Sequence, residues 1–438
     1  GLDAVSGLVY LDPDSSPAEP VAINTGVQRL LENLDEMPLP DAGYRVLEPP
    51  HRGVELRPDP LPAKRVAKHS LIASIISTHG CKFNCSYCPI PAVNQRTWRH
   101  KSPQRLATEI KLLYEEFGIR EFFSTDDNFF NRRETVVDLM TELARTRTGG
   151  QPLSSQIRFY TEATQFDVHK NQDILPLCHE GGMRGIFFGI EDITAELVNK
   201  GQNAPSTAQL FDRMWEVGIE PMAMMIHSDN QPLRAKSGDL SGLLNQARYL
   251  FDNGAVSYQC TYLGPAVGTR DVESAVETRS LYRSVGGELI PEAFYDGNHV
   301  VSSQNAKPWQ RQVNVLRAYA AFFNPLNTLR SILKLSSNPL SHKRLLYQFI
   351  GQIGLVLTVP KLLGWARHLE KGPIERWDGY QTARVPMIDA TSRDRIDWAV
   401  KYATEVKPRS NGHPKEGVSV SSDARRGRPT VPPILQSK

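Results

Sequence analysis

Cysteine is scarce in this chain, with five in 438 residues, and that scarcity excludes a disulfide-stapled secreted scaffold. The chain also has little excess of positive over negative residues. Its formal net charge is only +3, which is too small to indicate a nucleic-acid partner. The sequence opens without a secretory pattern, so we expect a cytoplasmic protein. What is present is enough apolar sequence to bury a sizeable core, as one large domain with extensions or as two domains.

Three of the five cysteines lie close together in the stretch GCKFNCSYC, as Cys81, Cys85 and Cys88. Zinc fingers and ribbons usually present two C-x2-C pairs, but here the second pair is missing, because Cys178 and Cys260 stand far away. Clustered thiolates select zinc or an iron–sulfur centre over hard metals. Structural four-iron clusters usually take four cysteines, so three leave one iron open to a small molecule. A zinc-stabilised binding module, an iron–sulfur electron carrier and a catalytic iron–sulfur site all remain open at this point.

From about residue 71, strand-like and helix-like segments alternate. The strand-like runs are rich in β-branched and aromatic residues, and they read LIASIIST, IREFFSTDD, IRFYTEA, RGIFFGIED, IEPMAMMIH and VSYQCTYLGP. Several of the helical segments between them end at glycine, a usual C-terminal signal. The alternation predicts an α/β fold of parallel βαβ units, but periodicity alone does not decide between a barrel and an open sheet.

Polar side chains follow four of these strands. They are Asp126, Asp127, Glu162, Glu191, His227 and Asp229. Because the carboxyl ends of parallel strands form the ligand-binding face of α/β proteins, we expect this set to share a site with the cysteine loop, which follows the first strand. Any single one could equally cap a turn or a helix, and His227 is more typical of a satisfied structural histidine.

The regions outside the alternation differ in composition. Residues 1–70 are rich in proline and acidic residues, which predicts a lead-in or linker on the domain surface, and residues 71–300 form the predicted core. Residues 301–404 are predicted as a mainly helical extension, and residues 405–438 as a disordered tail.

Within the extension, residues 311–380 carry ten Lys or Arg against three Asp or Glu, around the apolar run LLYQFIGQIGLVLTVPKLLGW. Glutamine, glycine and proline make that run a poor transmembrane span. A basic apolar region can form an ordinary packed subdomain, lie at a membrane interface or line an apolar substrate pocket. A peripheral contact with the inner membrane face and a lipid-like substrate are therefore both compatible with the sequence.

The cysteine loop resembles that of the radical SAM enzymes, whose C-x3-C-x-aromatic-C motif follows the first strand of a partial βα barrel; the aromatic here is Tyr87. The resemblance implies a partial (βα)6 TIM-like barrel with the proline-rich lead-in before it and the basic helical extension after it. It implies that Cys81, Cys85 and Cys88 hold a [4Fe–4S] cluster whose fourth iron binds S-adenosylmethionine. Reductive cleavage would give a 5′-deoxyadenosyl radical that abstracts hydrogen from the substrate, with the electron supplied by a low-potential donor such as flavodoxin or ferredoxin.

Shorter segments are similar to one group of radical SAM proteins, those with a cobalamin-binding domain. They are LDEMPLPD (34–41), STDDNFF (124–130), TEA (161–163), GMRGIFFGIE (182–191) and NKG (199–201). In that group the first of these joins an upstream cobalamin domain to the radical domain. The D-x-H-x-x-G motif that supplies the lower axial ligand of cobalamin does not occur here, and the sequence starts at Gly1, so we expect the cobalamin domain to lie upstream.

The resemblance also implies an activity. Many members of the group are methylases, so we expect cobalamin-dependent methylation of an unactivated carbon of a small molecule. Ring formation or rearrangement without methyl transfer is the alternative within the group, and an iron–sulfur electron carrier is the alternative from another class.

Carrying the resemblance over residue by residue gives candidate contacts with S-adenosylmethionine. Tyr87 and Gly268 would flank the adenine, although GPAVGT (264–269) departs from the group's P-x-P-G-T at Val267. The four acids would contact the ribose hydroxyls, the amino group or the substrate. They are Glu162 and Glu191 for the ribose or amino group, and Asp126 and Asp127 for the amino group or substrate.

Overall fold

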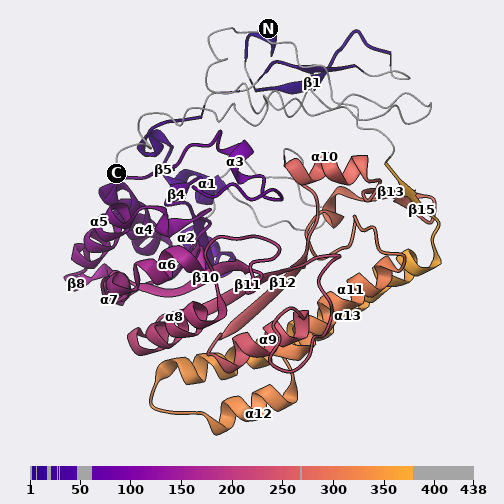
Figure 1. The fold of residues 1–438 in the computed structure, drawn as a ribbon. Helices are drawn as coiled ribbons and strands as arrows, with labels where there is room; N and C mark the ends of the chain where they lie inside the picture. Colours follow the sequence, from indigo (N-terminus) through magenta and orange to yellow (C-terminus); the bar gives the residue numbers. More distant parts are fainter. Residues whose placement is uncertain are drawn as a thin grey trace.

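The structure, a computed structural model, describes residues 2–5, 7–16, 21–26, 28, 30–46, 62–266 and 269–377. Its centre is one parallel sheet of six strands in the order β12-β11-β10-β9-β6-β3, curved into an open half-barrel (Figure 1). The strands are β3 (Ile72–Ile75), β6 (Glu121–Ser124), β9 (Arg158–Ala163), β10 (Met183–Glu191), β11 (Glu220–His227) and β12 (Ser257–Tyr262). Each strand pairs with the next in sequence, as successive βα units do. The predicted α/β partial (βα)6 barrel is confirmed.

Helices cover the outer face of this sheet. They are α4 (Pro103–Phe117), α5 (Arg133–Arg145), α6 (Gln165–Lys170), α7 (Leu175–Glu180), α8 (Ala204–Val217) and α9 (Leu243–Asp252). The chain signals their ends locally. In α4 the hydroxyl of the N-cap residue Ser102 accepts a hydrogen bond from the Arg105 amide, and Gly118 ends the helix in the left-handed conformation. Leu106, Ile110 and their neighbours at helical spacing are fully buried against the strands.

The two faces of the sheet are packed differently. Outward side chains such as Phe122, Phe159 and Phe188 are fully buried under the helices. Phe187 stands level with Glu162 on the neighbouring strand, and both are only partly buried, because the half-barrel is open on this concave side. A concave surface beside the carboxyl ends of parallel strands is the usual ligand site of such folds.

Short elements surround the cysteine loop and the lead-in. The loop lies inside a small hairpin of β4 (Thr78–His79) and β5 (Arg99–His100), with α3 (Ile90–Val93) between them. The lead-in forms η1 (Leu2–Ala4), the pair β1 (Val9–Leu11) and β2 (Ala22–Asn24), η2 (Leu34–Glu36), α1 (Pro40–Val46) and α2 (Ala63–His69). The excursions between the sheet strands form η3 (Phe129–Asn131), β7 (Arg147–Thr148), β8 (Gln151–Pro152), η4 (Leu153–Ser155) and η5 (Gln172–Ile174).

The predicted helical C-terminal region is confirmed. After β12 come α10 (Arg270–Glu277), β13 (Tyr282–Val285), β14 (Glu288–Leu289), η6 (Glu292–Phe294), α11 (Pro308–Phe322), α12 (Pro325–Leu333), α13 (Pro339–Lys371) and β15 (Ile374–Arg376). Helix α11 packs between β12 and the long α13 (Figure 1). Among the described residues, α13 is the one helix long and apolar enough to cross a membrane by length and composition. The predicted disordered tail lies outside the described residues, and the domain boundaries stay predictions.

Candidate functional site

The three loop cysteines lie near one another at the carboxyl end of the half-barrel. Cys81, Cys85 and Cys88 are partly buried and not in disulfides. Burial is the largest influence on all three and raises the pKa of each thiol, that of Cys88 to about 11. The ammonium of Lys200 works in the opposite direction on all three thiols. A cation beside the thiols favours the thiolate form, which is the form that binds metal.

The arrangement of donors suits a cluster better than a single ion. Within the described ranges, no group of three or more His, Cys, Asp or Glu side chains converges on the position of a single metal ion. A four-iron cluster binds each cysteine through a different iron, and its thiolates therefore stand farther apart. The buried hydroxyl of Tyr87, between Cys85 and Cys88 in sequence, lies beside the Cys85 thiol and acts to lower the pKa of that thiol. The donor set therefore fits the group that the resemblance implies.

Asp126 holds the start of the cysteine loop. Its Oδ1 accepts hydrogen bonds from the backbone amides of Ser77 (3.0 Å) and Thr78 (2.6 Å), and its Oδ2 accepts one from the Thr161 hydroxyl (2.6 Å). The residue is 1% exposed, and burial raises the pKa of its carboxyl although these hydrogen bonds lower it. The side chain thus ties three strand ends together, and its role as a contact for cofactor or substrate stays a prediction.

Asp127 supports the next part of the same loop. Its Oδ2 accepts from the Gly80 amide at 2.6 Å and from the Asn94 side chain at 2.9 Å. Gly80 has a φ of +94°, and a Cβ there would stand 2.0 Å from the Thr97 carbonyl oxygen, so only glycine fits at this point. The two neighbouring aspartates therefore fix residues 77–80, directly before Cys81.

A further anchor holds the loop from the side of β9. The amide of Lys82 donates to the side chain of Asn131 at 3.0 Å, and its ammonium lies 2.5 Å from the Asp167 carboxylate. Asp167 is 1% exposed and also accepts from the Asn128 side chain at 2.8 Å. Sequence patterns offer no reason to select Lys82 or Asp167, because the two lie 85 residues apart in the chain and meet only in the fold.

Glu191 and Lys200 form an ion pair beside the thiols. The Lys200 ammonium lies 3.0 Å from Glu191 Oε1, and the two side chains are 10% and 14% exposed. Glu191 has a φ of +63°, and a Cβ at Gly189 would come within 2.8 Å of its carboxylate, so the glycine leaves room for this side chain. Burial lowers the pKa of Lys200, but Glu191 and Cys85 together outweigh it and raise the pKa. The sequence analysis selected the segment NKG (199–201) only because it is similar to the family, and it did not identify Lys200 as a site residue.

Glu162 is the acid that lies free on the concave face. Among the described residues, no hydrogen bond or ion pair reaches its carboxylate, and burial, followed by the charges of Asp126, Asp127 and Glu191, raises its pKa to about 7. A carboxyl without a protein partner in a partly buried site is a candidate for ligand contact or proton transfer. The structure thus brings Glu162, Glu191 and the cysteine loop together, as the strand-end argument predicts.

The other candidates are placed as follows. His227 is fully buried between the side chains of Gln231 and Asn314, and burial lowers its pKa to about 4, so it is a neutral structural histidine. The Asp229 carboxylate accepts from the Tyr262 hydroxyl at 2.7 Å, away from the thiols in the C-terminal packing. The predicted adenine contact Gly268 lies outside the described residues.

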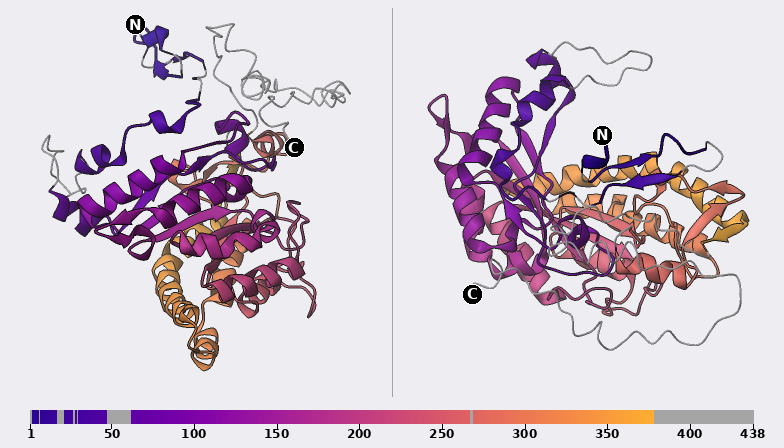
Figure 2. Two further views of the ribbon diagram at one scale, coloured as in Figure 1. Left: turned by 90° about the vertical axis from the view of Figure 1, so that its left-hand side faces the viewer. Right: turned by 90° about the horizontal axis from the view of Figure 1, so that it is seen from above.

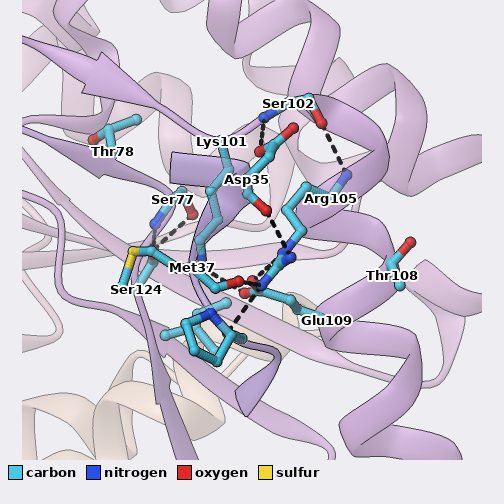
Figure 3. Close-up of polar contacts among 12 residues, drawn as sticks. Asp35, Met37, Ser77, Thr78, Lys101, Ser102, Arg105, Thr108, Glu109 and Ser124 are labelled. Carbon is cyan, nitrogen blue, oxygen red and sulfur yellow. Dashed lines mark hydrogen bonds and ion pairs between the residues drawn. The ribbon is translucent and has the colours of Figure 1, made fainter. Parts of the chain in front are cut away.

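The lead-in is fixed to the barrel beside the cysteine loop. The Arg105 guanidinium donates to the backbone carbonyls of Asp35 (3.0 Å) and Met37 (2.6 Å), while its Nε lies 2.6 Å from Glu109 (Figure 3). Glu109 also pairs with the buried Lys101 at 2.5 Å. The Ser102 amide donates to the Asp35 carboxylate at 2.9 Å, and Arg99 donates to the Leu31 carbonyl at 2.6 Å. Sequence composition predicted a surface lead-in but not this anchoring.

Comparisons with known proteins give the same superfamily that the cysteine loop resembles. Residues 75–230 match the family model described as "Radical SAM superfamily". The hopanoid C-2 methylase of Rhodopseudomonas palustris (strain TIE-1) is 36% identical over 137 residues, which are 30% of this chain and 25% of that protein. An uncharacterized methyltransferase of Synechocystis sp. is 32% identical over 157 residues, 35% of this chain and 28% of that protein. This chain therefore covers well under two thirds of either relative.

A solved structure shares the fold. The cobalamin-dependent S-adenosylmethionine radical enzyme OxsB, with aqua-cobalamin and S-adenosylmethionine bound, superposes with a TM-score of 0.51 at 14% identity, over 82% of this chain and 53% of that one. At this identity the likeness concerns the fold alone. With its cysteine loop on the open face of a parallel half-barrel, this chain matches the radical SAM superfamily across residues 75–230 and is similar over part of its length to proteins named as methylases.

Proposed function

We propose that this chain is the radical SAM part of an enzyme that methylates an unactivated carbon of a small molecule with the help of cobalamin. The observation that carries the proposal is the set of three partly buried thiols beside the Lys200 ammonium, on the open face of the half-barrel. The methylase names of the relatives support methyl transfer as the net reaction.

Cys81, Cys85 and Cys88 would hold the [4Fe–4S] cluster. Once bound, the cluster would supply the electron that cleaves S-adenosylmethionine to a 5′-deoxyadenosyl radical. Because Asp126 and Asp127 fix the backbone directly before Cys81, the thiols would keep their places when the cluster is lost and regained. Lys200 would offset part of the negative charge that three thiolates gather.

The acids on the concave face would orient S-adenosylmethionine. Glu162 has a free carboxylate with its pKa near 7, so close to neutral pH it can accept a hydrogen bond from a ribose hydroxyl or an amino group, or donate one when protonated. Glu191 is held by Lys200 and would offer its second oxygen. Tyr87 would meet the adenine. The surrounding half-barrel would limit water around a reactive radical.

Cobalamin is the second proposed cofactor. The 438 residues contain no D-x-H-x-x-G motif, so cobalamin would be held by another region or without an axial histidine from this chain. Arg105 fixes residues 35–38 on α4 beside the cysteine loop. A cobalamin domain joined through this lead-in would therefore start on the side of the barrel where the radical forms. A low-potential flavodoxin or ferredoxin would be the electron donor.

The test is anaerobic reconstitution with iron and sulfide, followed by electron paramagnetic resonance of the reduced protein with and without S-adenosylmethionine. A four-iron signal that shifts with the cofactor, together with formation of 5′-deoxyadenosine, is the expected result. The triple variant C81A/C85A/C88A should lose the signal, whereas the matched double variant C178A/C260A should keep it, because those two thiols are buried outside the loop. A cluster indifferent to S-adenosylmethionine would instead indicate an electron carrier, and product analysis would separate methylation from ring formation or rearrangement.

A further inference from the structure

Helix α12 has its polar and apolar sides reversed relative to an ordinary surface helix. Its buried side chains are polar, namely Asn327, Thr328 and Ser331. Its exposed side chains are apolar, namely Leu326 (66% exposed), Leu329 (50%), Ile332 (44%) and Leu333 (76%). A helix on the surface of a globular protein normally buries its apolar stripe, so this side of α12 is suited to a non-aqueous neighbour.

Hydrogen bonds fix α12 in this orientation. The Asn327 side chain donates to the Phe322 carbonyl at 2.9 Å, and the Thr328 hydroxyl accepts from Gln352 of α13 at 2.7 Å. Rotating the helix to bury its leucines would break these bonds and leave buried polar groups unpaired, which is unfavourable. The hydrogen bonds of the buried side therefore keep the leucines of α12 exposed.

The neighbouring helix α13 continues the same surface. Leu346, Phe349, Ile350, Ile353, Val356 and Leu357 are between 49% and 75% exposed. Their spacing of three and four places them on one side of the helix, along roughly 17 Å, while Gln348 on the other side is fully buried. Because α12 and α13 pack against each other, their exposed apolar side chains are here called together the apolar hairpin surface, and exposed apolar side chains in such number mark a membrane or protein contact.

Charge at this surface favours a lipid over a protein copy. Residues 308–371 contain nine Lys or Arg and one Glu. Four of these cations are paired with acids of the barrel or buried, namely Arg311, Arg330, Lys343 and Arg344. Lys334 and Lys361 are exposed and lie at the two ends of the apolar side chains. Pairing two copies of the chain through this surface would bring like charges together. An anionic bilayer supplies both the apolar interior and the opposite charge that such a surface needs.

We propose that the apolar hairpin surface docks on an anionic phospholipid bilayer, with α12 and the first half of α13 lying in the interface. α13 does not cross the bilayer, because both of its ends are held to the barrel. The Tyr347 hydroxyl donates to Glu220 at 2.9 Å, Arg344 donates to the Phe251 carbonyl, and the Trp365 indole donates to the Val300 carbonyl at 3.1 Å.

The docked orientation has a consequence for the site. α12 projects from the end of the barrel opposite β4 and β5, the hairpin that carries the cysteine loop (Figures 1 and 2). Docking would therefore leave the cysteine site facing away from the bilayer, accessible to electron donors and to soluble or carrier-presented substrates. This inference stands apart from the proposed methylation and needs no cluster for its test.

The test is flotation of the 438-residue chain with vesicles of phosphatidylcholine alone and of phosphatidylcholine mixed with phosphatidylglycerol. The protein should float with the mixed vesicles at low salt, less at high salt, and little with the neutral ones. The variant L329S/L333S/I353S/L357S should bind at least about tenfold more weakly, because it removes four apolar insertions. The variant K334E/K361E should lose most of the dependence on anionic lipid.

The matched control is V9S/L11S/L71S/L289S, which changes four side chains of similar exposure elsewhere on the surface and should float like the unchanged protein. Circular dichroism establishes that each variant is folded. Absence of flotation with mixed vesicles at low salt would overturn the proposal. So would equal binding by the apolar variant, or a dimer that the apolar variant dissociates while no vesicle binding is seen, since the surface would then serve a second copy.

Discussion

The Lys200 ammonium lies 3.0 Å from the Glu191 carboxylate, and the same ammonium stands close enough to Cys81 and Cys85 to oppose the rise that burial causes in the pKa of both thiols. One buried cation thus serves two partners of the site. We expect Lys200→Met to leave Glu191 without its partner and to cost about 3 kcal/mol of unfolding free energy, measured by urea denaturation of the metal-free protein. Iron content after reconstitution should also fall.

A double variant separates those two effects. Lys200→Met combined with Glu191→Gln removes the stranded charge, so it should recover most of the lost stability while cluster content stays low. If the single and double variants reconstitute as much iron as the unchanged protein, Lys200 has no part in stabilising the thiolates.

Asp126 offers a test of loop anchoring. Asp126→Ala removes the acceptor of two backbone amides and one hydroxyl in a fully buried place, so we expect a loss of about 3 kcal/mol and poor cluster retention. Asp173→Ala is the matched control, because its carboxylate pairs with Arg133 at the surface, with side chains 63% and 40% exposed, and should change stability little. Equal losses in the two variants, or full iron content in Asp126→Ala, would remove the anchoring role.

The sequence predicted the half-barrel well because its main signals are local. Alternating β-branched runs and glycine-terminated helices identify βα units, and the strand ends then locate Glu162 and Glu191 on the face that carries the thiols. The function of Asp126 was not predictable in the same way. Its hydrogen-bond partners Ser77 and Thr78 lie 49 and 48 residues away in the chain, so only the folded arrangement shows that a strand-end acid holds a loop.

Helix α12 is a case in which the sequence pattern predicts the wrong side of a helix to be buried. The segment PLNTLRSIL has helical periodicity, and an amphipathic pattern predicts that its leucines face the core. In the structure Asn327 and Thr328 are buried instead, because carbonyls at the end of α11 and Gln352 of α13 satisfy them. The periodicity of the sequence shows that the helix has a polar and an apolar side. Tertiary hydrogen bonds decide which of the two sides faces the core.

Gly80 provides a third prediction. Gly80→Ala adds both a positive-φ penalty and a clash, since the new Cβ would stand 2.0 Å from the Thr97 carbonyl oxygen. Gly118→Ala is the matched control: φ is +71° there, but nothing lies within 4 Å of the added Cβ. We expect about 1 kcal/mol of destabilisation at Gly118 and clearly more at Gly80, with lower iron content only at Gly80. Thermal unfolding and iron analysis would measure these effects. A similar loss of stability at both positions would mean that the loop rearranges to accommodate the added methyl group at residue 80.

Glu162 gives a prediction about pH. Its pKa in the folded protein is about 7, raised from 4.5, so between these values the folded state keeps a proton that the unfolded state has lost. The stabilising contribution is therefore fully present below about pH 4.5 and is lost as pH rises through about 7. Glu162→Gln should make the metal-free protein about 2 kcal/mol more stable at pH 8, with little difference at pH 4.5.

The same variant separates stability from ligand contact. Glu288→Gln, on the exposed β14, should leave the pH dependence of unfolding unchanged. If Glu162 also contacts S-adenosylmethionine, Glu162→Gln should weaken the cofactor-induced shift of the cluster signal while the signal without cofactor stays the same, because the carboxylate is not a cluster ligand. A pH profile of unfolding that is identical in Glu162→Gln and the unchanged protein would mean that Glu162 titrates normally. Its placement among Asp126, Asp127 and Glu191 would then be offset by solvent on the open face of the half-barrel.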